Sequence, residues 1–305
     1  MTQKQQTLPQ FSAPLVPTLR HDVYPSIDSS STLADAASSV KGVLVTGSGR
    51  GVGRSTALAF ARAGAKKVVL TSRTKAELEE VRAEIEKLGK GTEVRVVDVD
   101  LTEEESVEKL FNEAGEVDVL VNNAGYLEPC VSIRDSNPSD WIRTQEINTT
   151  GTYLATRAFL RQASANNLMG GSHKLTVINT SSIGSVGTRP GFSSYQAGKT
   201  FINRFSEFLH FEEPDVRTFA IHPGGVMTKL AKDSMPPDTH SFLTDTPELS
   251  AHFSLWLATS DETDFLRGKY VSANWDVDEL LAKKDEIIEK DLLWTRVVGQ
   301  EQIMK

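Results

Sequence analysis

Tyr195 and Lys199 are the residues of this chain whose types and spacing best suit proton transfer. They stand four positions apart in Tyr195-Gln196-Ala197-Gly198-Lys199, a spacing that brings two side chains to one face of a helix. A tyrosine hydroxyl, with an ordinary pKa of about 10, is a slow acid or base at neutral pH, and an adjacent ammonium lowers that pKa. The pair therefore predicts general acid–base chemistry. The alternative is a half-exposed helical pair without a catalytic role.

A glycine-rich turn earlier in the chain has the composition of an anion site. The segment Thr46-Gly47-Ser48-Gly49-Arg50-Gly51-Val52-Gly53 follows the apolar run Val43-Leu44-Val45 and leads into an alanine-rich segment. Glycines let the backbone approach an anion closely, and the free N–H groups at a helix start point toward it. A strand, a glycine turn and a helix in this order predict a nucleotide-phosphate site, with a flexible surface loop as the alternative.

The elements that must position these residues alternate between strands and helices. We expect strands at 43–46, 67–71, 93–98, 117–121, 175–178 and 216–221. We expect helices at about 52–63, 75–88, from 103, 138–165 and 194–211. Val-rich strands that are apolar on both faces and separated by helices require a parallel sheet covered on two sides. The predicted fold class is α/β, a doubly wound, Rossmann-like parallel sheet with ligands at the carboxyl ends of its strands.

Two flanking segments frame this single domain. Residues 1–40 are rich in Gln, Ser, Thr and Pro without a sustained period, which predicts an extended N-terminal arm with little core. Residues 41–275 form the predicted nucleotide-binding domain. Residues 276–305 form a helical C-terminal tail of the same unit, with Leu280, Leu281, Ile287 and Ile288 at helical spacing.

Capping boxes are predicted at two helix starts. Thr74 stands three residues before Glu77, and Thr102 stands three residues before Glu105. In such a box the threonine and the acid each bond a backbone N–H of the first turn. The two pairs therefore predict helices that begin near residues 75 and 103.

The glycine turn and three later motifs resemble the short-chain dehydrogenase/reductase family over about residues 41–275. The turn reads Thr-Gly-x-x-x-Gly-x-Gly because position 52 is valine, so it does not fit the commoner Gly-x-Gly-x-x-Gly fingerprint. Asp100-Leu101, Asn122-Asn123-Ala124-Gly125 and Pro223-Gly224-Gly225-Val226-Met227-Thr228 follow predicted strands, with Asp98-Val99 as a competing alignment for the first. The resemblance implies cofactor-binding roles for Gly47, Ser48, Arg50, Gly51, Val52, Gly53, Ser72, Arg73, Asp100, Leu101, Asn123, Ala124, Gly125, Tyr195, Lys199, Pro223, Gly224, Val226 and Thr228.

Two arginines bear on which form of the cofactor binds. The second predicted strand ends in Leu70-Thr71-Ser72-Arg73, without the acid that in NAD-preferring members bonds the ribose 2′-hydroxyl and repels a 2′-phosphate. Arg73 is therefore available to a phosphate, and Arg50 stands where NADP-using members carry a second cation. We expect NADP(H) as the cofactor. The alternative is that both arginines are ordinary surface charges.

The resemblance also implies a catalytic set. Ser182, thirteen positions before Tyr195, matches the serine that hydrogen-bonds the substrate oxygen, with Ser181 as its rival. Asn148 matches the asparagine that holds a water linking Lys199 to solvent, and Lys199 would also bond the nicotinamide ribose. In this reading C4 of NADPH delivers hydride to a ketone or aldehyde carbon, Tyr195 is the general acid and Ser182 stabilises the oxyanion. A cap for Ser182 and a helix-kink residue for Asn148 are the alternatives.

The predicted substrate walls are mostly apolar. They come from the loop after Gly125 and the loop from Lys229 to about Thr246, and they comprise Tyr126, Leu127, Cys130, Phe192, Met227, Leu230, Met235, Phe242 and Leu243. Small-ligand pockets use such walls with few polar anchors. We therefore expect a hydrophobic carbonyl or alcohol substrate rather than a sugar.

The arm from Tyr24 to Asp28 and the tail from Asn274 to Leu280 resemble fungal secondary-metabolism members of the family, which implies natural-product tailoring. Two other functions stay open: a redox-neutral cyclisation, isomerisation or dehydration by an NADP(H)-binding member, and a non-catalytic NADP(H)-sensing protein. An intact serine, tyrosine and lysine argue against the second. The family commonly pairs subunits through its two long helices, so a homodimer or homotetramer is expected.

Composition narrows the class of protein further. A net charge of −8 over 305 residues argues against a nucleic-acid partner, and no apolar run approaches the roughly 18 residues of a membrane helix.

The single cysteine, Cys130, precludes an internal disulfide, and no secretory signal is recognisable, so we expect a cytoplasmic location. We expect Cys130 to pack in the substrate wall. The six histidines lack metal-ligand spacing, and no metal is expected.

Overall fold

Seven parallel strands form one sheet at the centre of the structure, a computed structural model that describes residues 15–170 and 174–297. The strands are β1 (Val43–Thr46), β2 (Lys67–Ser72), β3 (Glu93–Asp98), β4 (Val119–Asn122), β5 (Thr176–Thr180), β6 (Arg217–His222) and β7 (Tyr270–Ser272). Their order across the sheet is β3-β2-β1-β4-β5-β6-β7, and every neighbouring pair is parallel. The predicted Rossmann-like fold is confirmed, with the direction of winding reversing between β1 and β4.

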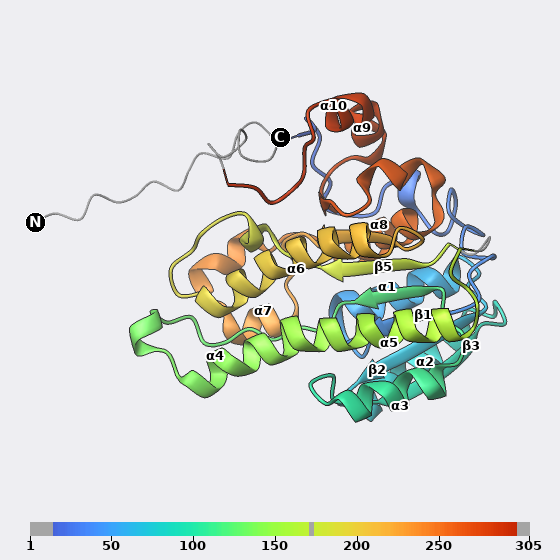
Figure 1. The fold of residues 1–305 in the computed structure, drawn as a ribbon, viewed down its shortest axis with the longest axis horizontal. Helices are drawn as coiled ribbons and strands as arrows, with labels where there is room; N and C mark the ends of the chain where they lie inside the picture. Colours follow the sequence, from blue (N-terminus) through green and yellow to red (C-terminus); the bar gives the residue numbers. More distant parts are fainter. Residues whose placement is uncertain (1–14, 171–173, 298–305) are drawn as a thin grey trace, which may run out of the picture.

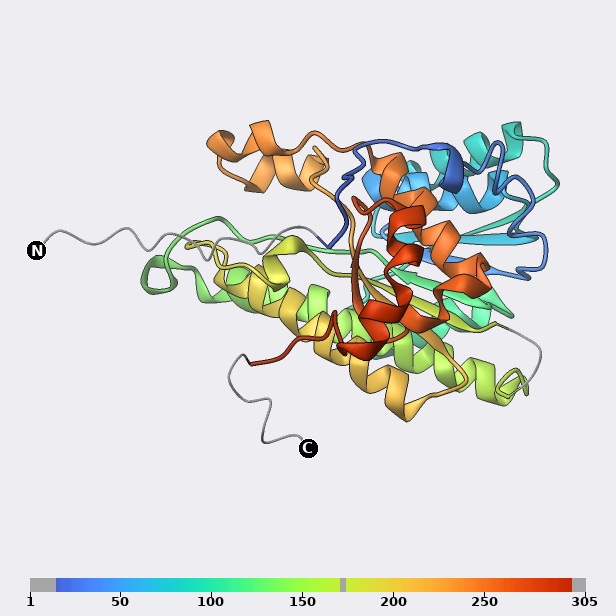
Figure 2. The same ribbon diagram turned by 90° about the horizontal axis from the view of Figure 1, so that it is seen from above.

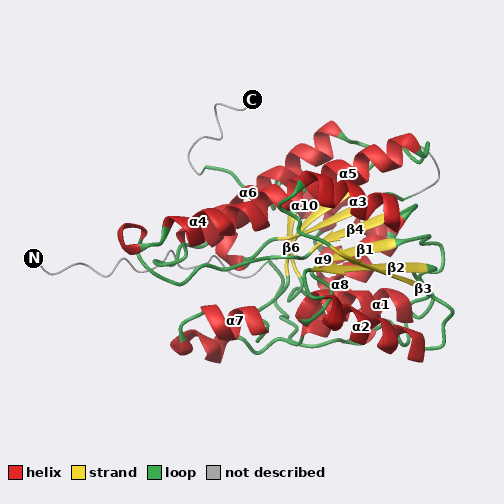
Figure 3. Ribbon diagram, turned by 90° about the horizontal axis from the view of Figure 1, so that it is seen from below, coloured by secondary structure: helices red, strands yellow, loops and turns green. Residues whose placement is uncertain are grey.

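Helices cover both faces of this sheet because its strands are apolar on both sides (Figure 3). One face carries α1 (Gly51–Arg62), α2 (Lys75–Lys87) and α8 (Pro247–Thr259). The other carries α3 (Glu104–Ala114), α5 (Gly151–Ala165) and α6 (Ser193–Glu212). In β1, for example, Val43 and Val45 enter one core while Leu44 enters the other, as alternation along a strand requires.

The helix predicted from Pro138 to Ala165 has those ends but is not uniform. It consists of α4 (Pro138–Gln145), a π-helical turn (Glu146–Thr150) and α5, which run on as the long green ribbon of Figure 1. The Thr149 hydroxyl donates to the carbonyl oxygen of Gln145 at 2.6 Å within this stretch. Because π-turns re-aim side chains inside a helix, this one decides where the predicted Asn148 points.

The described part of the N-terminal arm packs against the body more than its composition predicts. Residues 15–40 contribute five buried apolar side chains to the core on the α1 and α8 face: Val16, Tyr24, Ile27, Ala37 and Val40. The expectation of an arm with little core is therefore wrong for this stretch. Residues 1–14 lie outside the described residues.

The C-terminal tail docks on the body, as expected, but it is not one helix. It forms α9 (Val277–Ala282) and α10 (Lys284–Glu289), which meet at Lys283. Leu280 and Ile287 are buried, whereas Ile288 is 54% exposed. Each short helix therefore buries its own apolar residues. The part of the predicted tail after residue 297 lies outside the described residues.

The arm and the tail lie side by side although they stand at opposite ends of the sequence (Figure 2). Thr18 donates to Glu279 through its backbone N–H at 2.9 Å and through its hydroxyl at 2.7 Å. Arg20 forms an ion pair of 2.7 Å with Asp276, and Leu19 makes a β-bridge with Trp275. These contacts join the chain ends over one end of the sheet.

The two predicted capping boxes are absent from the described helices. Thr74 precedes α2 but makes no side-chain cap bond, and Glu77 instead pairs with Arg50. Helix α3 begins one residue later than predicted, and Thr102 bonds the carboxylate of Asp100. Glu77 and the Thr102 hydroxyl thus bond groups in the loops at the strand ends, which compete with the helix N–H groups for them.

Candidate active site

A cavity of about 1640 Å³ at the carboxyl ends of the strands brings most predicted site residues together. Small-molecule sites ordinarily measure roughly 300–1,000 Å³, so the space suits a large ligand with a second molecule beside it. The predicted residues that line it are Gly47, Arg50, Gly51, Val52, Ser72, Arg73, Asp100, Leu101, Asn123, Ala124, Gly125, Ser182, Tyr195, Lys199, Pro223, Gly224, Val226 and Thr228. The predicted residues that do not line it are Ser48, Gly53 and Asn148.

The glycine turn between β1 and α1 has the geometry of an anion site. Gly47 and Gly51 have φ angles of +66° and +56°, which side chains rarely adopt. A Cβ on Gly47 would lie 2.9 Å from the Cα of Ala124, so the chain after β4 packs directly on the turn. Arg50 precedes α1 without a side-chain cap bond, which leaves N–H groups of the first turn for a ligand. This cradle fits the phosphates of a dinucleotide.

Ser48 and Gly53 shape the turn from behind. Ser48 is buried, and its hydroxyl accepts a hydrogen bond of 2.9 Å from the N–H of Thr71 in β2. A Cβ on Gly53 would lie 2.4 Å from the carbonyl oxygen of Gly47 and from Nδ2 of Asn123. Both residues therefore hold the shape of the turn and do not reach a ligand themselves.

The two arginines differ in their neighbours. Arg73 is exposed at the edge of the cavity, and the structure gives it no ion pair with any described residue. Arg50 pairs with Glu77 of α2 at 3.1 Å, and Glu77 also lines the cavity. The end of β2 lacks an acid, as the sequence shows, but an acid from α2 stands beside one of the two cations.

Asp100 and Leu101 line the cavity beyond the end of β3, whereas Asp98 is exposed and does not. The Asp100 carboxylate accepts hydrogen bonds from the backbone N–H and the hydroxyl of Thr102 at 3.0 and 2.7 Å. These bonds, assisted by the charge of Arg73, hold the pKa of Asp100 below its ordinary value. Asp100 is therefore an ionised acceptor at the rim of the cleft.

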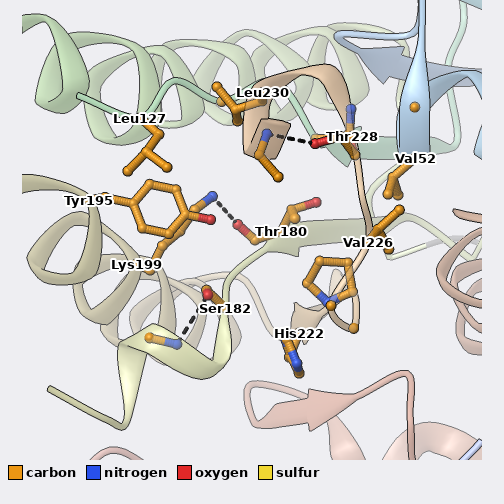
Figure 4. A pocket seen from close by; sticks show the side chains of 18 of the residues that line it. Val52, Leu127, Thr180, Ser182, Tyr195, Lys199, His222, Val226, Thr228 and Leu230 are labelled. Atoms are coloured by element: carbon orange, nitrogen blue, oxygen red, sulfur yellow. Dashed lines mark hydrogen bonds between the residues drawn. The ribbon is translucent and has the colours of Figure 1, made fainter. Parts of the chain in front are cut away.

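Tyr195 and Lys199 lie together near the start of α6 and face the cavity (Figure 4). Nζ of Lys199 is 5.5 Å from the centre of the Tyr195 ring and donates to the carbonyl oxygen of Thr180 at 2.6 Å. Burial lowers the pKa of Lys199 to about 8 and raises the pKa of Tyr195, which a hydrogen bond with Ser182 partly opposes. The predicted lowering of the Tyr195 pKa by Lys199 is therefore wrong for this state, in which burial raises that pKa and Tyr195 is a neutral proton donor.

The two rival serines occupy different environments. Ser182 lines the cavity, bonds to Tyr195 and accepts the N–H of Gly184 at 3.0 Å. Ser181 is buried, and its hydroxyl donates to Oδ1 of Asn203 at 2.6 Å. Ser182 is thus the serine that a ligand in the cavity can reach.

Asn148 lies in the π-turn, is 1% exposed and binds the backbone of one residue. Its amide oxygen accepts the N–H of Tyr126 and its amide nitrogen donates to the carbonyl oxygen of Tyr126, both at 2.8 Å. The asparagine therefore holds the segment after β4, while its neighbour Ile147 reaches the cavity. Its role as a water ligand stays a prediction.

Glu128, which sequence reasoning missed, does not line the cavity but supports the start of α6 behind Tyr195. It is 3% exposed, and Oε1 accepts the backbone N–H groups of Ser194 and Tyr195 at 2.9 and 3.2 Å. A carboxylate at a helix N-terminus satisfies free donors and interacts favourably with the helix dipole. Its charge also contributes to the raised pKa of Tyr195. The only sequence signal is an acid inside the apolar segment Tyr126-Leu127-Glu128-Pro129.

His222 is the second missed residue, since the sequence reading placed all histidines in structural or surface roles. It ends β6 and lines the cavity, and its Nδ1 accepts the N–H of Ile183 at 3.1 Å. Burial lowers the pKa of His222 to about 4, against the opposing charge of Asp245. The ring is therefore neutral at pH 7, with its proton on Nε2. Its position directly before Pro223-Gly224 was the available signal.

The predicted apolar walls line the cavity with two exceptions, Cys130 and Met227. The thiol of Cys130 donates to the carbonyl oxygen of Ser234 at 3.3 Å and so ties the segment after β4 to the end of α7 (Lys229–Ser234). Burial and the charge of Glu128 raise the pKa of this thiol to about 11. The expected place of Cys130 in the substrate wall is therefore wrong, and a thiol with this pKa is a poor nucleophile.

Within residues 15–170 and 174–297 no group of three or more His, Cys, Asp or Glu side chains has the arrangement to hold a metal ion. No helix in the same ranges is both long and apolar enough to cross a membrane.

Comparison with known proteins adds to this geometry. The family model "short chain dehydrogenase" matches residues 41–238. Short chain dehydrogenase mpl6 of Monascus purpureus is 40% identical over 290 residues, which cover 91% of this chain and 94% of that protein. A 3-ketoacyl-(acyl-carrier-protein) reductase from Brucella melitensis complexed with NADH superposes with a TM-score of 0.67 at 28% identity, over 76% of this chain and 96% of that one. A putative NAD(P) dependent gluconate 5-dehydrogenase from Beutenbergia cavernae with bound NADP gives a TM-score of 0.67 at 25% identity, over 77% and 95%.

Proposed function

The chain belongs to the short-chain dehydrogenase family, and on that premise we propose that it reduces a ketone or aldehyde of a hydrophobic small molecule with NADPH. The observation that carries the proposal is that Ser182, Tyr195 and Lys199 line the cavity that also contains the glycine turn, with Nζ of Lys199 5.5 Å from the centre of the Tyr195 ring. A proton donor, an oxygen-binding hydroxyl and a cradle for nucleotide phosphates thus share one space.

The cofactor enters this proposal through the residues that would hold it. The pyrophosphate would lie on the glycine turn at Gly47 and Gly51, the adenine beside Asp100, and the nicotinamide end near Pro223 and Thr228. When bound there, NADPH supplies the reducing equivalent for the carbonyl carbon. The protein itself then has to bind the carbonyl oxygen of the substrate and supply a proton to it.

The chain's own residues account for the proton. Tyr195 is neutral, because burial raises its pKa, and so it can donate its hydroxyl proton to a carbonyl oxygen. The Ser182 hydroxyl is placed to donate a second hydrogen bond to that oxygen and to stabilise its developing charge. Lys199, with a pKa of about 8, carries a positive charge at pH 7 and stabilises the phenolate that Tyr195 leaves behind.

The preference for NADP(H) over NAD(H) rests on the two arginines. Arg73 is exposed and without an ion partner among the described residues, and is therefore available to a 2′-phosphate. Arg50 is held by Glu77 at 3.1 Å, so binding a phosphate would compete with this exposed pair, which costs little to break. Related structures contain both NADH and NADP and do not decide the question.

The substrate assignment rests on the apolar cavity walls. Tyr126, Leu127, Phe192, Phe242 and Leu243 face the space beside Tyr195. Such walls favour an apolar or aromatic carbonyl compound over a sugar. The similarity to fungal proteins such as mpl6 of Monascus purpureus supports a role in natural-product tailoring.

We also propose that two or four copies associate through α5 and α6. These helices expose apolar side chains on their outer surfaces: Tyr153 is 46% exposed, Phe201 40%, Phe208 54% and Phe211 66%. Clustered exposed apolar groups favour an interface. Light scattering should give a dimer or tetramer, and a monomer would contradict this proposal. A cytoplasmic location stays part of the proposal on the basis of the single cysteine.

The test of the proposed function is Tyr195→Phe, assayed by NADPH oxidation over a panel of apolar ketones and aldehydes. Removing the acid should lower kcat by about 10²–10⁴-fold while NADPH affinity stays within about threefold of wild type. Tyr153→Phe, an exposed tyrosine on α5, is the matched control. Products should be heavier than substrates by two hydrogen atoms. Turnover retained in Tyr195→Phe, or a product of unchanged mass, overturns the assignment.

A further inference from the structure

Part of the wall of this cavity, here called the far lobe, is formed by Leu19, Ile183, His222, Tyr270, Trp275 and Leu293. Figure 4 shows the His222 side chain turned away from Tyr195 and Lys199, on the other side of Ser182. Tyr270 and His222 belong to one face of neighbouring strands, because β6 and β7 pair Ala220 with Tyr270 and His222 with Ser272. The far lobe therefore lies over the β7 end of the sheet, continuous with the reaction centre.

Segments outside the region of the family match enclose this lobe. The match ends at residue 238 and begins at residue 41, whereas Leu19 belongs to the arm and Trp275 and Leu293 to the C-terminal segment. Two hydrogen bonds hold the arm in place: the Arg20 N–H donates to the carbonyl oxygen of Asn274 at 2.7 Å, and the Asn274 side-chain amide donates to the carbonyl oxygen of Arg20 at 2.9 Å. The wall that Leu19 forms is therefore anchored and not a loose end.

The walls of the far lobe expose apolar surface to the cavity. Leu19 is 47% exposed, and Ile183 and Val186 on the turn after Ser182 are 48% and 52% exposed. All three line the same cavity. Apolar side chains left exposed around a concave space mark a ligand-binding surface. The occupant that fits is the apolar body of a molecule whose reacting carbonyl lies at Ser182 and Tyr195.

His222 supplies a polar group to the far lobe, beside the Tyr270 hydroxyl, which has no hydrogen-bond partner among the described residues. Its Nδ1 is occupied by the N–H of Ile183 at 3.1 Å, which leaves Nε2 as a hydrogen-bond donor. No described residue takes up that nitrogen, and His222 lines the cavity. Because Nε2–H of His222 has no acceptor among the described residues, a ligand that places an accepting oxygen beside it should bind more tightly than one that does not.

The charge near His222 decides what kind of oxygen this is. The Asp245 carboxylate is near enough to influence the titration of His222. It is held in place by His21 at 2.5 Å, by the N–H of Gly225 at 2.5 Å and by the amide of Asn274 at 2.9 Å. A fixed negative charge beside a neutral donor disfavours an anionic group on the ligand. A carbonyl, ester or hydroxyl oxygen fits this donor better than a carboxylate.

We infer that the arm and the C-terminal segment form the specificity half of the substrate site, which selects an apolar ketone or aldehyde bearing a second, uncharged oxygen that accepts a hydrogen bond from Nε2 of His222. This inference rests on the proposed carbonyl reduction. It gives the N-terminal arm a role in substrate selection, and it makes His222 a residue that distinguishes between substrates without taking part in proton transfer.

The experiment uses pairs of aryl methyl ketones and two variants of His222. In each pair one ketone carries a methyl ester at a chosen distance from the carbonyl, and the other carries an alkyl group of the same size. His222→Asn keeps an acceptor near Nδ1 and removes the Nε2–H donor, whereas His222→Gln places an amide N–H near Nε2. Wild type should prefer the best-placed ester by about 5–10-fold in kcat/KM, in line with one hydrogen bond. His222→Asn should lose this preference and His222→Gln should retain part of it.

A second variant tests the wall that the arm supplies. Leu19→Ala should raise KM for the larger ketones by about tenfold, as expected for loss of apolar contact, with the smallest ketone least affected and NADPH affinity unchanged. Ile288→Ala is the matched control, because Ile288 is 54% exposed on α10 and does not line the cavity. Equal KM values for Leu19→Ala and wild type across the series would remove the arm from the site.

Binding measurements separate this inference from the proposed function. The same ester and alkyl pairs are titrated by calorimetry into Tyr195→Phe protein saturated with NADPH, with and without His222→Asn. A preference for the ester that His222→Asn abolishes supports the far lobe whether or not any ketone is reduced. If ketones are reduced but ester and alkyl partners bind equally, the inference fails and the proposed function stands. If the ester preference is present but no ketone is reduced, the proposed function fails.

Discussion

The two halves of the cavity are built from different kinds of structure. The cofactor half consists of glycine turns and backbone groups at the ends of β1, β4 and β6, all inside residues 41–238. The far lobe consists largely of side chains from before and after that region. Phosphates are bound by backbone N–H groups that a glycine turn presents, whereas an apolar substrate is selected by the shape of side chains. One half of the site thus follows from a local motif, and the other from packing between the two ends of the chain.

The largest expected effect breaks the cofactor half. In Gly53→Ala the added Cβ would lie 2.4 Å from the carbonyl oxygen of Gly47, so the turn must shift. We expect NADPH affinity, measured by fluorescence titration, to fall on the order of 100-fold. Gly91→Ala is the control for a strained backbone alone: Gly91 has a φ of +74°, but a Cβ there meets nothing within 4 Å and the residue does not line the cavity, so this variant should lower stability and leave NADPH affinity unchanged. Wild-type affinity in Gly53→Ala would show that the turn does not need its close packing.

The next effect concerns the charges at the rim of the cofactor half. In Arg50→Ala/Arg73→Ala the preference for NADPH over NADH should fall by about 100-fold, since two charge-assisted phosphate contacts are lost. Arg54→Ala, which removes an arginine paired with Glu84 outside the cavity, should leave the preference unchanged. Isothermal titration with both cofactors measures this. Equal affinity of the unmutated protein for NADPH and NADH would refute the assignment.

His222, at the boundary between the two halves of the cavity, should make the free energy of unfolding depend on pH. His222 has a pKa of about 4 in the fold against 6.5 ordinarily, so the unfolded chain binds more protons between these values. Its contribution to the free energy of unfolding is present above pH 6.5 and lost as the pH falls through 4. From pH 7 to pH 4.5 wild type should lose on the order of 2 kcal/mol more than His222→Asn.

Urea unfolding at several pH values measures this difference. His252→Asn is a useful comparison, because burial also lowers the pKa of His252 but that residue lies outside the cavity, next to Ser29. It should flatten the same pH profile without changing substrate preference. Identical pH slopes for wild type and His222→Asn would mean that His222 is not held neutral by the fold.

The smallest expected effect concerns Glu128, the buried acid that accepts the N–H groups of Ser194 and Tyr195. Glu128→Gln keeps an oxygen that can accept the N–H groups of Ser194 and Tyr195 but removes the charge that raises the pKa of Tyr195. The limb of the kcat profile on which reduction falls with rising pH should move to lower pH by about one unit. A purely structural cap would change stability and leave the profile in place.

A remote cap provides the control for that prediction. The Ser260 hydroxyl accepts the N–H of Glu262 at 3.3 Å, and neither residue lines the cavity. Ser260→Ala should lower stability by about 1 kcal/mol and should not move the pH profile. A shift of the same size in Ser260→Ala would assign the Glu128→Gln effect to general destabilisation.

What the sequence predicted and what it missed follow the same division. The six predicted strands, the sheet type and the glycine turn were predictable because hydrophobic period and local turn chemistry determine them. Glu128 and His222 were not, because their roles depend on contacts with Ser194 and Ile183, which lie 66 and 39 positions away. Neither the hydrophobic period nor a short sequence motif indicates contacts between residues so far apart in the chain.

The arm and the tail show the same limit for the fold. Low apolar content predicted an arm with little core, yet Val16 and Ile27 are fully buried because α8 and the C-terminal segment supply their partners. Helical spacing predicted one tail helix, yet Lys283 separates α9 from α10, and Leu280 of the first and Ile287 of the second are buried in the same core. Tertiary packing overrides local preference at both places.

The pairing of the chain ends also sets an order of assembly. Thr18 bonds Glu279 across 261 positions and Arg20 bonds Asp276 across 256, so these are among the longest-range contacts of the molecule. During synthesis the arm leaves the ribosome before the sheet does and waits for its partners until the chain beyond the sheet has followed. The glycine turn can close well before that point, because its partners Thr71 and Asn123 lie 23 and 77 positions away. A nascent chain therefore acquires its nucleotide cradle early and its substrate-selecting wall last.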